Sequence, residues 1–403
     1  MSGFGQFSWV GARLERVLGP GWAAFAGIFV VTNLGLLAIG ATLPVLPRFV
    51  NGELGGSDFE VAIVSGAFAV TGIVCRPLAG RIADRRGRRI TVIAGAALAV
   101  VAGALLFLPA SIPGLIASRL VLGAGEGAVF VAGSAWVVDM SPEDRRGRMI
   151  GLYGLSIWTG LTLGPPVGEL LLRAGGYDLV WAFAAAAPLL GALVASRLPE
   201  GNAPGGEQAR GPLISREAAG PGGTFALGVF GFAAVSAFIV LSLDERGIGH
   251  GPEVFSVFAG TVVATRLFGG NLPDRIGPAQ CAVGAALVEA LGLFLLGIGE
   301  SLPVVIVGAM GMGAAFSLLF PALSLLAVNR VAPERRGAAM GTFTASFDLG
   351  MLVGSPAVGV AAALGGYSAA FYLAGAAALA SAAITSAYFI SEPLPTPVRL
   401  RDG

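Results

Sequence analysis

The sequence predicts an all-α membrane protein with twelve transmembrane helices, arranged as two six-helix parallel repeats. The first observation is composition: 55% of the residues are hydrophobic, 12% are charged and the mean hydropathy is +0.81. A soluble fold of 403 residues cannot bury that much apolar surface. The second observation is the spacing of apolar runs, and the third is an internal repeat. Because one crossing of a bilayer takes about 20 apolar residues, a chain of this length has room for roughly twelve spans.

Six apolar runs in the first half of the chain are each long enough to cross a bilayer. The run from Gly21 to Leu46 is too long for the core of a signal peptide and lacks a small-residue cleavage site, so we interpret it as a span. Charged residues, glycine or proline separate the others. The predicted spans are 22–46, 58–79, 90–109, 113–139, 149–172 and 178–197. They predict an N-terminal six-helix bundle over residues 1–197.

A polar segment over residues 198–223 follows the sixth span and is rich in glycine, proline and charged residues. This composition is typical of a flexible linker, so we predict a cytoplasmic linker between two membrane halves. Six further apolar runs predict a C-terminal six-helix bundle over residues 224–403. These runs are 224–243, 252–272, 279–299, 302–330, 338–363 and 368–390.

The basic residues are distributed unevenly between the two sides of the predicted bundle. All 25 are arginines. Arg48, Arg173 and Arg246 fall in predicted outer loops and Arg119 falls inside a span, while the others lie in inner loops or toward the inner ends of spans if the N-terminus is cytoplasmic. Because cytoplasmic loops carry the excess of positive charge, we expect a multi-pass protein of the plasma or inner membrane with both termini in the cytoplasm. No basic patch outside the loops suggests nucleic-acid binding.

The two halves share one sequence register. Pairs at a single constant offset include Asp84 with Asp274, Gly147 with Gly337, Pro166 with Pro356 and residues 175–177 with 365–367. Chance does not keep one register over such a length. With an even number of spans each, the halves have the same orientation and are related by an axis along the membrane normal. A substrate is expected in the central cavity between such halves.

The loop after the second predicted span reads Gly80-Arg81-Ile82-Ala83-Asp84-Arg85-Arg86-Gly87-Arg88-Arg89. An arginine-rich inner loop can be a topology signal alone, and Arg86 and Arg89 are interpreted in that way. Asp84 differs, because a carboxylate among arginines can bridge helix ends and fix the guanidinium groups. The loop resembles the signature of the major facilitator superfamily between its second and third helices: Gly, three residues, Asp, two residues, Gly, Arg, and Arg or Lys.

This resemblance implies the twelve-helix major facilitator fold and a transporter that works as a monomer on a small-molecule substrate in the lipid bilayer. It covers nearly the whole chain at the level of the fold, whereas the specific motifs lie in the first half. The resemblance also implies a cytoplasmic latch that stabilises the outward-facing state. Its residues are Gly80, Asp84, Arg85, Gly87 and Arg88, with Asp139 at the inner end of the fourth helix. The alternative for Asp139 is a solvated acid.

Inside the fourth predicted span, Arg119 is followed by Gly123 and Glu126. A charge at mid-bilayer costs about 2.5–3.5 kcal/mol on insertion scales, so an arginine there is a functional candidate. Arg119 and Glu126 lie two helical turns apart and therefore share one face. Arg119 with Gly123 resembles the family's fourth-helix signature of Arg, three residues, Gly, which is associated with proton coupling. A structural ion pair between Arg119 and Glu126 is the alternative.

Glycine and proline recur along the fifth predicted span at Gly160, Gly164, Pro165, Pro166 and Gly168. The glycines form a ridge that lets another helix approach closely, and the prolines are expected to bend the helix. A lone Gly-x-x-x-Gly pair would indicate only packing. The full run resembles the fifth-helix signature of the family's antiporters, found chiefly among exporters that exchange substrate for protons. Glu169 replaces the final glycine of that signature, so looser packing is expected at the outer end.

Further polar residues within spans are Asn33, Trp158, Glu289 and Asp348. An ionised Asp348 near the middle of its span would be strongly disfavoured, so we expect reversible protonation there. Glu289 lies in the ninth span, which is peripheral in this fold, and has both a functional and a purely structural interpretation. Asn33 and Trp158 are candidates for the substrate cavity. The first span has no acid, although many proton-coupled drug exporters carry one there.

Together these features favour a proton-coupled antiporter that exports a mostly apolar small molecule, resembling the drug and proton antiporters of the family. A sugar or metabolite facilitator or importer is the alternative, although spans rich in Ala, Val, Leu, Gly and Phe offer few groups for a sugar. A membrane sensor or enzyme is the alternative of another class. We expect no enzyme, cofactor or metal, because the single histidine, His250, lies in a predicted loop and no acids cluster. Cys75 and Cys281 are interpreted as packed free thiols.

Overall fold

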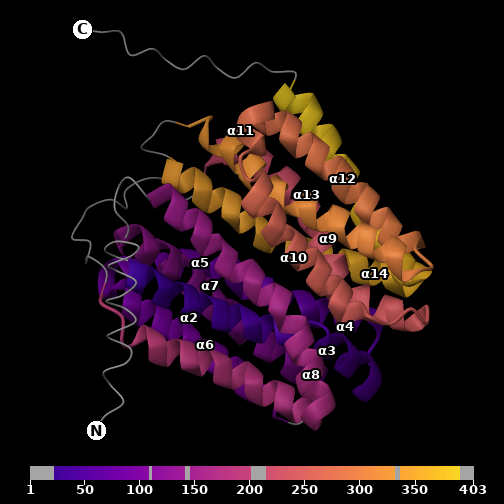
Figure 1. Cartoon of the computed structure of the whole chain (residues 1–403), viewed down its shortest axis with the longest axis horizontal. Coiled ribbons are helices and arrows are strands. Elements are labelled where there is room, and N and C mark those ends of the chain that lie inside the picture. Colours follow the sequence, from indigo (N-terminus) through magenta and orange to yellow (C-terminus); the bar gives the residue numbers. More distant parts are fainter. Residues whose placement is uncertain (1–21, 109–110, 141–145, 201–214, 332–335, 391–403) are drawn as a thin grey trace. The chain divides into compact units, whose positions relative to one another are not determined.

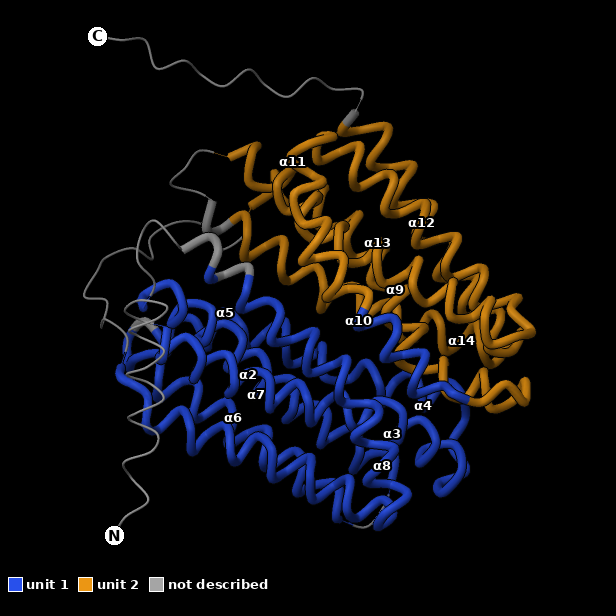
Figure 2. The backbone as a smooth tube through the Cα atoms, in the orientation of Figure 1, with its two compact units in different colours: residues 1–206, 250–260 blue, residues 207–249, 261–403 orange. Residues whose placement is uncertain are grey.

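A computed structural model describes residues 22–108, 111–140, 146–200, 215–331 and 336–390. Every regular element in these ranges is a helix, and no strand occurs among them. The chain divides into two compact units, coloured separately in Figure 2. Unit 1 holds residues 1–206 and 250–260, and unit 2 holds residues 207–249 and 261–403. Residues 201–214 of the predicted linker, and both termini, lie outside the described ranges.

Unit 1 is a bundle of long apolar helices (Figure 1). Its elements are α2 (Trp22–Thr42), α3 (Val45–Arg48), η1 (Phe49–Glu53), α4 (Asp58–Gly66), α5 (Phe68–Arg86), α6 (Arg88–Leu105), α7 (Ile112–Met140) and α8 (Arg146–Ala195). Helix α4 begins with a capping box, because the Ser57 hydroxyl accepts from the Glu60 N–H while the Glu60 carboxylate accepts from the Ser57 N–H. Gly87 ends α5 with a φ of 104°, a conformation that side chains with a Cβ rarely adopt.

Helix α8 contains the fifth and sixth predicted spans, joined without a loop. Its backbone leaves helical geometry only at Gly175 and Gly176, where the φ of Gly176 is 68°. The helical backbone is continuous through Pro165 and Pro166, so the two prolines do not end the helix. A positive φ is open to glycine at little steric cost, which explains why the chain reverses at this glycine pair.

Unit 2 repeats this pattern. Its elements are α9 (Arg216–Glu245), α10 (Gly251–Gly269, whose first part belongs to unit 1), α11 (Leu272–Ile276), α12 (Pro278–Ile298), α13 (Leu302–Val328), α14 (Arg336–Thr385) and η4 (Ser386–Ile390). Helix α14 is interrupted at Gly365 and Gly366. These two glycines stand at the positions that the repeat register pairs with Gly175 and Gly176.

The start of α9 corrects the predicted linker. The sequence places the end of the linker at residue 223, yet α9 already begins at Arg216. Packing holds this glycine-rich first part in place: a Cβ at Gly222 would collide with the Ser346 hydroxyl, and the Ser215 N–H donates to Thr342 at 2.9 Å. Tertiary contacts therefore override the weak helix propensity of this segment.

Among the described residues, nine helical stretches are long and apolar enough to cross a membrane. Two of them, Leu152–Ala195 and Ala339–Phe389, each contain one glycine-pair break and are long enough for two spans. These stretches agree with the predicted all-α membrane fold. Helix α10, the predicted eighth span, is not among them, so the total of twelve remains a prediction.

A seam of small residues joins α2 to α8 within unit 1. A Cβ at Gly164 would lie 2.5 Å from the Gly40 backbone, and one at Gly168 would collide with the Ala41 carbonyl oxygen. The two backbones are therefore in direct contact, as small residues allow in membrane helices. The hydrophobic core of unit 1 includes Trp136, which is fully buried, and Tyr153, which is 2% exposed.

Arg246 caps the C-terminal end of α12 in unit 2. Its Nη1 donates to the carbonyl oxygens of Leu296 (2.8 Å) and Gly299 (2.9 Å), and its Nη2 donates to the Ser242 hydroxyl (2.8 Å). The last carbonyl groups of a helix have no partner within the helix and carry partial negative charge. Partial burial lowers the pKa of Arg246 from its ordinary value.

Candidate functional site

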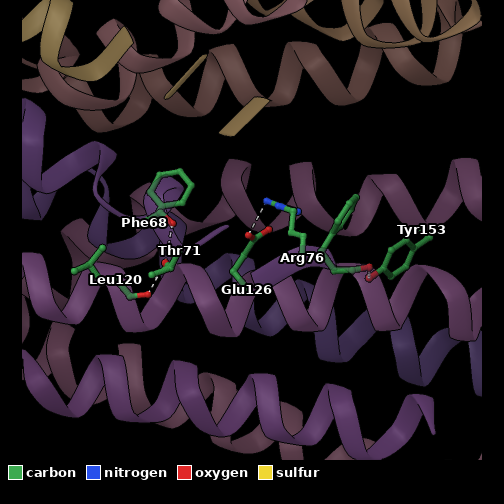
Figure 3. Close-up of polar contacts among 7 residues, drawn as sticks. Phe68, Thr71, Arg76, Leu120, Glu126 and Tyr153 are labelled. Carbon is green, nitrogen blue, oxygen red and sulfur yellow. Dashed lines mark hydrogen bonds and ion pairs between the residues drawn. The ribbon is translucent and has the colours of Figure 1, made fainter. Parts of the chain in front are cut away.

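The most prominent polar contact inside unit 1 is an ion pair between two long apolar helices. Arg76 on α5 donates to Glu126 on α7, with an Nη2 to Oε2 distance of 3.0 Å (Figure 3). The side chains are only 14% and 17% exposed. The Arg76 guanidinium also lies 5.4 Å from the centre of the Phe130 ring. Little water therefore screens the attraction between the two charges.

Glycines on α7 bring this pair together. A Cβ at Gly123 would collide with the carbonyl oxygen of Phe68, so α7 and the start of α5 touch backbone to backbone. Beside that contact the Thr71 hydroxyl donates to the Leu120 carbonyl oxygen at 2.6 Å (Figure 3). A Cβ at Gly127 would lie 3.1 Å from the Arg76 stem. The glycines thus set the helix spacing at which Arg76 reaches Glu126.

Arg119 is buried without an acidic partner. It is 5% exposed, its Nη2 donates to the Thr42 hydroxyl at 3.2 Å, and its buried Nε has no hydrogen-bond partner among the described residues. The sequence left open an ion pair between Arg119 and Glu126. In the structure, Glu126 pairs with Arg76, and no carboxylate in the described ranges lies within ion-pair distance of Arg119.

Two adjoining hollows inside unit 1 connect the neighbourhoods of these residues. Arg119 and Thr42 line one hollow, and Glu126 lines the other. The two share the lining residues Gly35, Ile39, Ala99, Leu122 and Pro188, which come from α2, α6, α7 and α8. Apart from Arg119, Glu126 and the hydroxyl groups of Thr42 and Ser118, the lining residues are apolar. A buried cation and a paired carboxylate therefore line two neighbouring hollows within a single bundle.

Asn33 and Trp158, two predicted cavity residues, both take part in packing. The Asn33 amide donates to the Ser156 carbonyl oxygen at 3.0 Å and to the Thr159 hydroxyl at 2.9 Å, which joins α2 to α8. Trp158 on α8 is 8% exposed, and its ring meets Phe258 edge to face at 6.0 Å. Neither residue lines the two hollows.

The structure brings two residues of the predicted latch together at the end of unit 1 that is predicted to be the inner one. Arg88, the first residue of α6, donates to Asp139 near the end of α7 with an Nε to Oδ2 distance of 3.0 Å. Arg88 is 9% exposed, so this pair is mostly shielded from water. The Asp84 side chain lies outside the described part of the structure, and Arg85 is exposed. Gly80 faces Val131 of α7, where a Cβ would make an ordinary contact of 3.6 Å.

Sequence reasoning missed Glu200 at the same inner end. Its carboxylate accepts from the Arg89 backbone N–H at 2.9 Å and lies 3.5 Å from the Arg89 Nε, while the Arg89 Nη1 donates to the Leu198 carbonyl oxygen. Arg89, which the sequence analysis interpreted as a topology signal, therefore holds the segment after α8 against the start of α6. Sequence reasoning also missed Arg76 as a site residue, although it falls within the predicted second span.

At the end of unit 1 that is predicted to be the outer one, Glu169 has two arginine partners. Arg48 lies 2.8 Å from one of its carboxylate oxygens and Arg173 lies 3.0 Å from the other. Glu169 replaces the final glycine of the antiporter signature, where looser packing is expected. Its neighbour Gly168 is nevertheless in backbone contact with Ala41. The Arg48–Glu169 pair joins α3 to α8, whereas the Arg173–Glu169 pair lies within α8.

Two acidic residues are fully buried in unit 2. Asp348 lies in the first segment of α14, two residues before Gly350, where a Cβ would come within 2.6 Å of the Ala226 carbonyl oxygen of α9. Glu289 lies in α12 and faces the same helix α9 through Gly228 and Gly231. Across the described ranges, no group of three or more His, Cys, Asp or Glu side chains could hold a metal ion.

Long apolar helices that enclose an ion pair, a buried arginine and a hollow are typical of membrane transport proteins. The family model of the Major Facilitator Superfamily matches residues 28–253 and 223–402. An uncharacterized MFS-type transporter of Salmonella typhimurium is 32% identical over 363 residues, which are 87% of this chain and 92% of that protein. One from Burkholderia mallei is 33% identical over 372 residues, covering 89% and 90%. The chain therefore belongs to the major facilitator superfamily of membrane transporters.

Solved structures agree with the fold. The nucleoside transporter NupG superposes with a TM-score of 0.78 at 12% identity, over 91% of this chain and all of that one. The human organic anion transporter MFSD10 superposes with a TM-score of 0.69 at 22% identity, over 91% and 99%. At such low identity these similarities concern the fold alone.

Proposed function

We propose that this transporter is a proton-coupled antiporter that exports a mostly apolar small molecule, such as a drug or natural product, by alternating access. The observation that carries the proposal is the Arg76–Glu126 ion pair, shielded between two apolar helices and facing a hollow. A carboxylate in such a place can exchange an arginine partner for a proton, which changes the charge balance of the bundle.

In the proposed cycle Glu126 is the proton carrier of unit 1. Protonation removes the negative charge that holds Arg76, so the pair opens and α5 can move relative to α7. Loss of the proton restores the pair. Asp348 is the second candidate carrier, because it is fully buried in unit 2. Arg119 adds a second buried positive charge to the same bundle.

The Arg88–Asp139 pair is proposed to act as the cytoplasmic latch. It joins the inner ends of α6 and α7 at 3.0 Å and stabilises the state in which these ends are closed. This role requires the arginine-rich loop to lie in the cytoplasm, together with both termini, in the plasma or inner membrane. The protein is proposed to work as a monomer.

The test is a proton-flux assay in reconstituted liposomes. A pH-sensitive dye is enclosed, a pH gradient is imposed, and lipophilic cations, neutral antibiotics, organic anions and sugars are added in turn. Proton movement triggered by an apolar compound is expected, and it should be lost when Glu126 and Asp348 are both replaced by their amides. Asp178→Asn is the matched control, because Asp178 is exposed on α8.

Two results would count against the proposal. Unchanged pH-dependent exchange in the double amide variant would remove the assigned carriers. Gradient-independent equilibration of a sugar would instead identify a facilitator.

An anionic cargo is the second candidate, and Arg119 favours it. A buried guanidinium without a carboxylate partner is a ready site for the negative group of a substrate. The human organic anion transporter, which is similar in fold, is a precedent for such a cargo within this fold. In the same assay an organic anion would then give the largest proton signal, and Arg119→Gln would abolish it while leaving the response to neutral compounds unchanged.

A further inference from the structure

Glu289 stands apart from the other acidic side chains described above. It is 0% exposed, and both of its carboxylate oxygens are buried without a hydrogen-bond partner in the described structure. Glu126, Asp139, Glu169 and Glu200 each have an arginine within 3.5 Å. The surroundings of Glu289 must therefore accommodate the carboxyl group without a positive charge.

A pair of glycines on α9 makes the space that this carboxyl group fills. A Cβ at Gly231 would lie 2.6 Å from Oε1, and a Cβ at Gly228 would lie 3.3 Å from Oε2. Residues three apart share one helix face, so the two glycines form a single niche facing α12. The other side chains at this niche are apolar and come from α12 and α13: Leu293, Met312 and Leu319.

In the described structure no arginine pairs with Glu289, and the arginines of the neighbouring helices α9, α11 and α14 stand at or next to the ends of those helices. Helix α13 carries no titratable residue, and α9 carries charged residues only near its two ends. On its own helix the other titratable residue is Cys281, about two turns away. Helix α14 contributes Asp348, which is an acid, and two tyrosines. Tyr367 packs on Phe238 and Tyr372 on Phe294.

The chemistry of a carboxyl group in this niche favours its neutral form. An isolated carboxylate in an apolar interior is destabilised by many kcal/mol, and proteins respond by keeping the group protonated. A neutral carboxylic acid can instead donate a hydrogen bond to a nearby backbone carbonyl after a small rotation. The glycines expose the α9 backbone on this side, which gives such a donor a place to bond.

We infer that Glu289, together with Gly228 and Gly231, forms a proton-binding site inside unit 2. The carboxyl group holds its proton while α9, α12 and α13 are packed together. It releases the proton when these helices separate and water reaches the niche. The inference does not rest on the proposed antiport, since the carriers assigned there are Glu126 and Asp348.

Infrared spectroscopy of the full chain in lipid vesicles at neutral pH tests the site directly. The wild-type protein should show the C=O stretching band of a protonated carboxyl group in apolar surroundings. The band should be missing from Glu289→Gln and should shift in Gly231→Ala, where the new methyl group displaces the carboxyl. Asp348→Asn is the matched control, and the Glu289 band should persist in it. A spectrum of Glu289→Gln identical to wild type in this region would overturn the inference.

A second measurement does not depend on the folding of Gly231→Ala. Unfolding by detergent in weakly buffered solution at neutral pH should release one proton more from the wild type than from Glu289→Gln, because the exposed carboxyl group ionises. Folded Glu289→Gln should be more stable than the wild type at neutral pH, because only the wild-type carboxyl group gains free energy by ionising when the protein unfolds. Equal proton release from the two proteins, or a large loss of stability in Glu289→Gln, would show that the folded carboxyl group is ionised.

Discussion

Replacing Arg76 by glutamine would leave the Glu126 carboxylate between two apolar helices without its partner. Removal of one member of a buried ion pair destabilises a protein by about 3–5 kcal/mol. The side chains here are 14% and 17% exposed, which places Arg76→Gln near the lower end, at about 3 kcal/mol. Glu126→Gln should have a similar effect, because it leaves the arginine uncompensated.

The double variant Arg76→Gln with Glu126→Gln should be more stable than either single variant. It buries no unpaired charge and loses only the net contribution of the pair, which is about 0–1 kcal/mol. The expected coupling energy between the two positions is therefore several kcal/mol. Such a value would distinguish a true pair from two independent contacts.

The assay is unfolding in mixed micelles as a function of denaturing detergent, with the four proteins of the cycle measured side by side. Arg81→Gln is the matched control, because Arg81 lies on the same helix and is exposed; it should change the free energy of unfolding by less than about 0.5 kcal/mol. Additive effects of the two single substitutions would refute the reasoning, since they would mean that Arg76 and Glu126 do not stabilise one another.

Three other predictions follow from packing and polar contacts. Gly168→Ala should destabilise unit 1 by about 1–3 kcal/mol, because the new methyl group clashes with α2. Gly284→Ala is the control: its Cβ meets nothing within 4 Å, so the free energy of unfolding should stay the same or rise by up to about 1 kcal/mol. Equal effects of the two substitutions on thermal unfolding would contradict this prediction. Arg246→Ala should lower the free energy of unfolding by about 2–3 kcal/mol, because it leaves carbonyl groups at the C-terminal end of α12 unpaired. Arg275→Ala is the control, because Arg275 is exposed. A loss of stability no larger than that of the control would show that the carbonyl groups find other partners. Arg88→Ala should open the inner ends of α6 and α7 and speed amide hydrogen exchange there, by tenfold for each 1.4 kcal/mol lost; exchange at the wild-type rate would rule out a latch.

Much of the fold could be predicted from the sequence, because spans in lipid must be long, apolar and helical. The glycine pairs at 175–176 and 365–366 mark reversals of the chain that the repeat register already aligned. The predicted linker extends to residue 223, whereas α9 begins at Arg216. The glycine content of this segment carries no information about the packing that holds it as a helix.

Sequence reasoning proposed Arg119 and Glu126 as site residues but missed Arg76, the partner of Glu126. Helical periodicity placed Arg119 and Glu126 on one face, whereas Glu126 binds Arg76 of another helix. That choice depends on how closely two helices approach, and a spacing within one helix carries no such information. The same holds for Glu200, which contacts Arg89 only because the segment after α8 packs against the start of α6.

The sequence by itself determined that this protein is a polytopic helical transporter of the major facilitator superfamily, because hydropathy, charge asymmetry and a glycine-arginine motif are local properties of the chain. Only the tertiary structure decided which charges are paired, that Arg119 faces a hollow without a carboxylate, and that Glu289 is enclosed by α9. Ion pairing and burial are set by contacts between segments that are distant in the sequence. Glu126 and Glu289 are the same residue type, yet one contacts an arginine and the other contacts a pair of glycines.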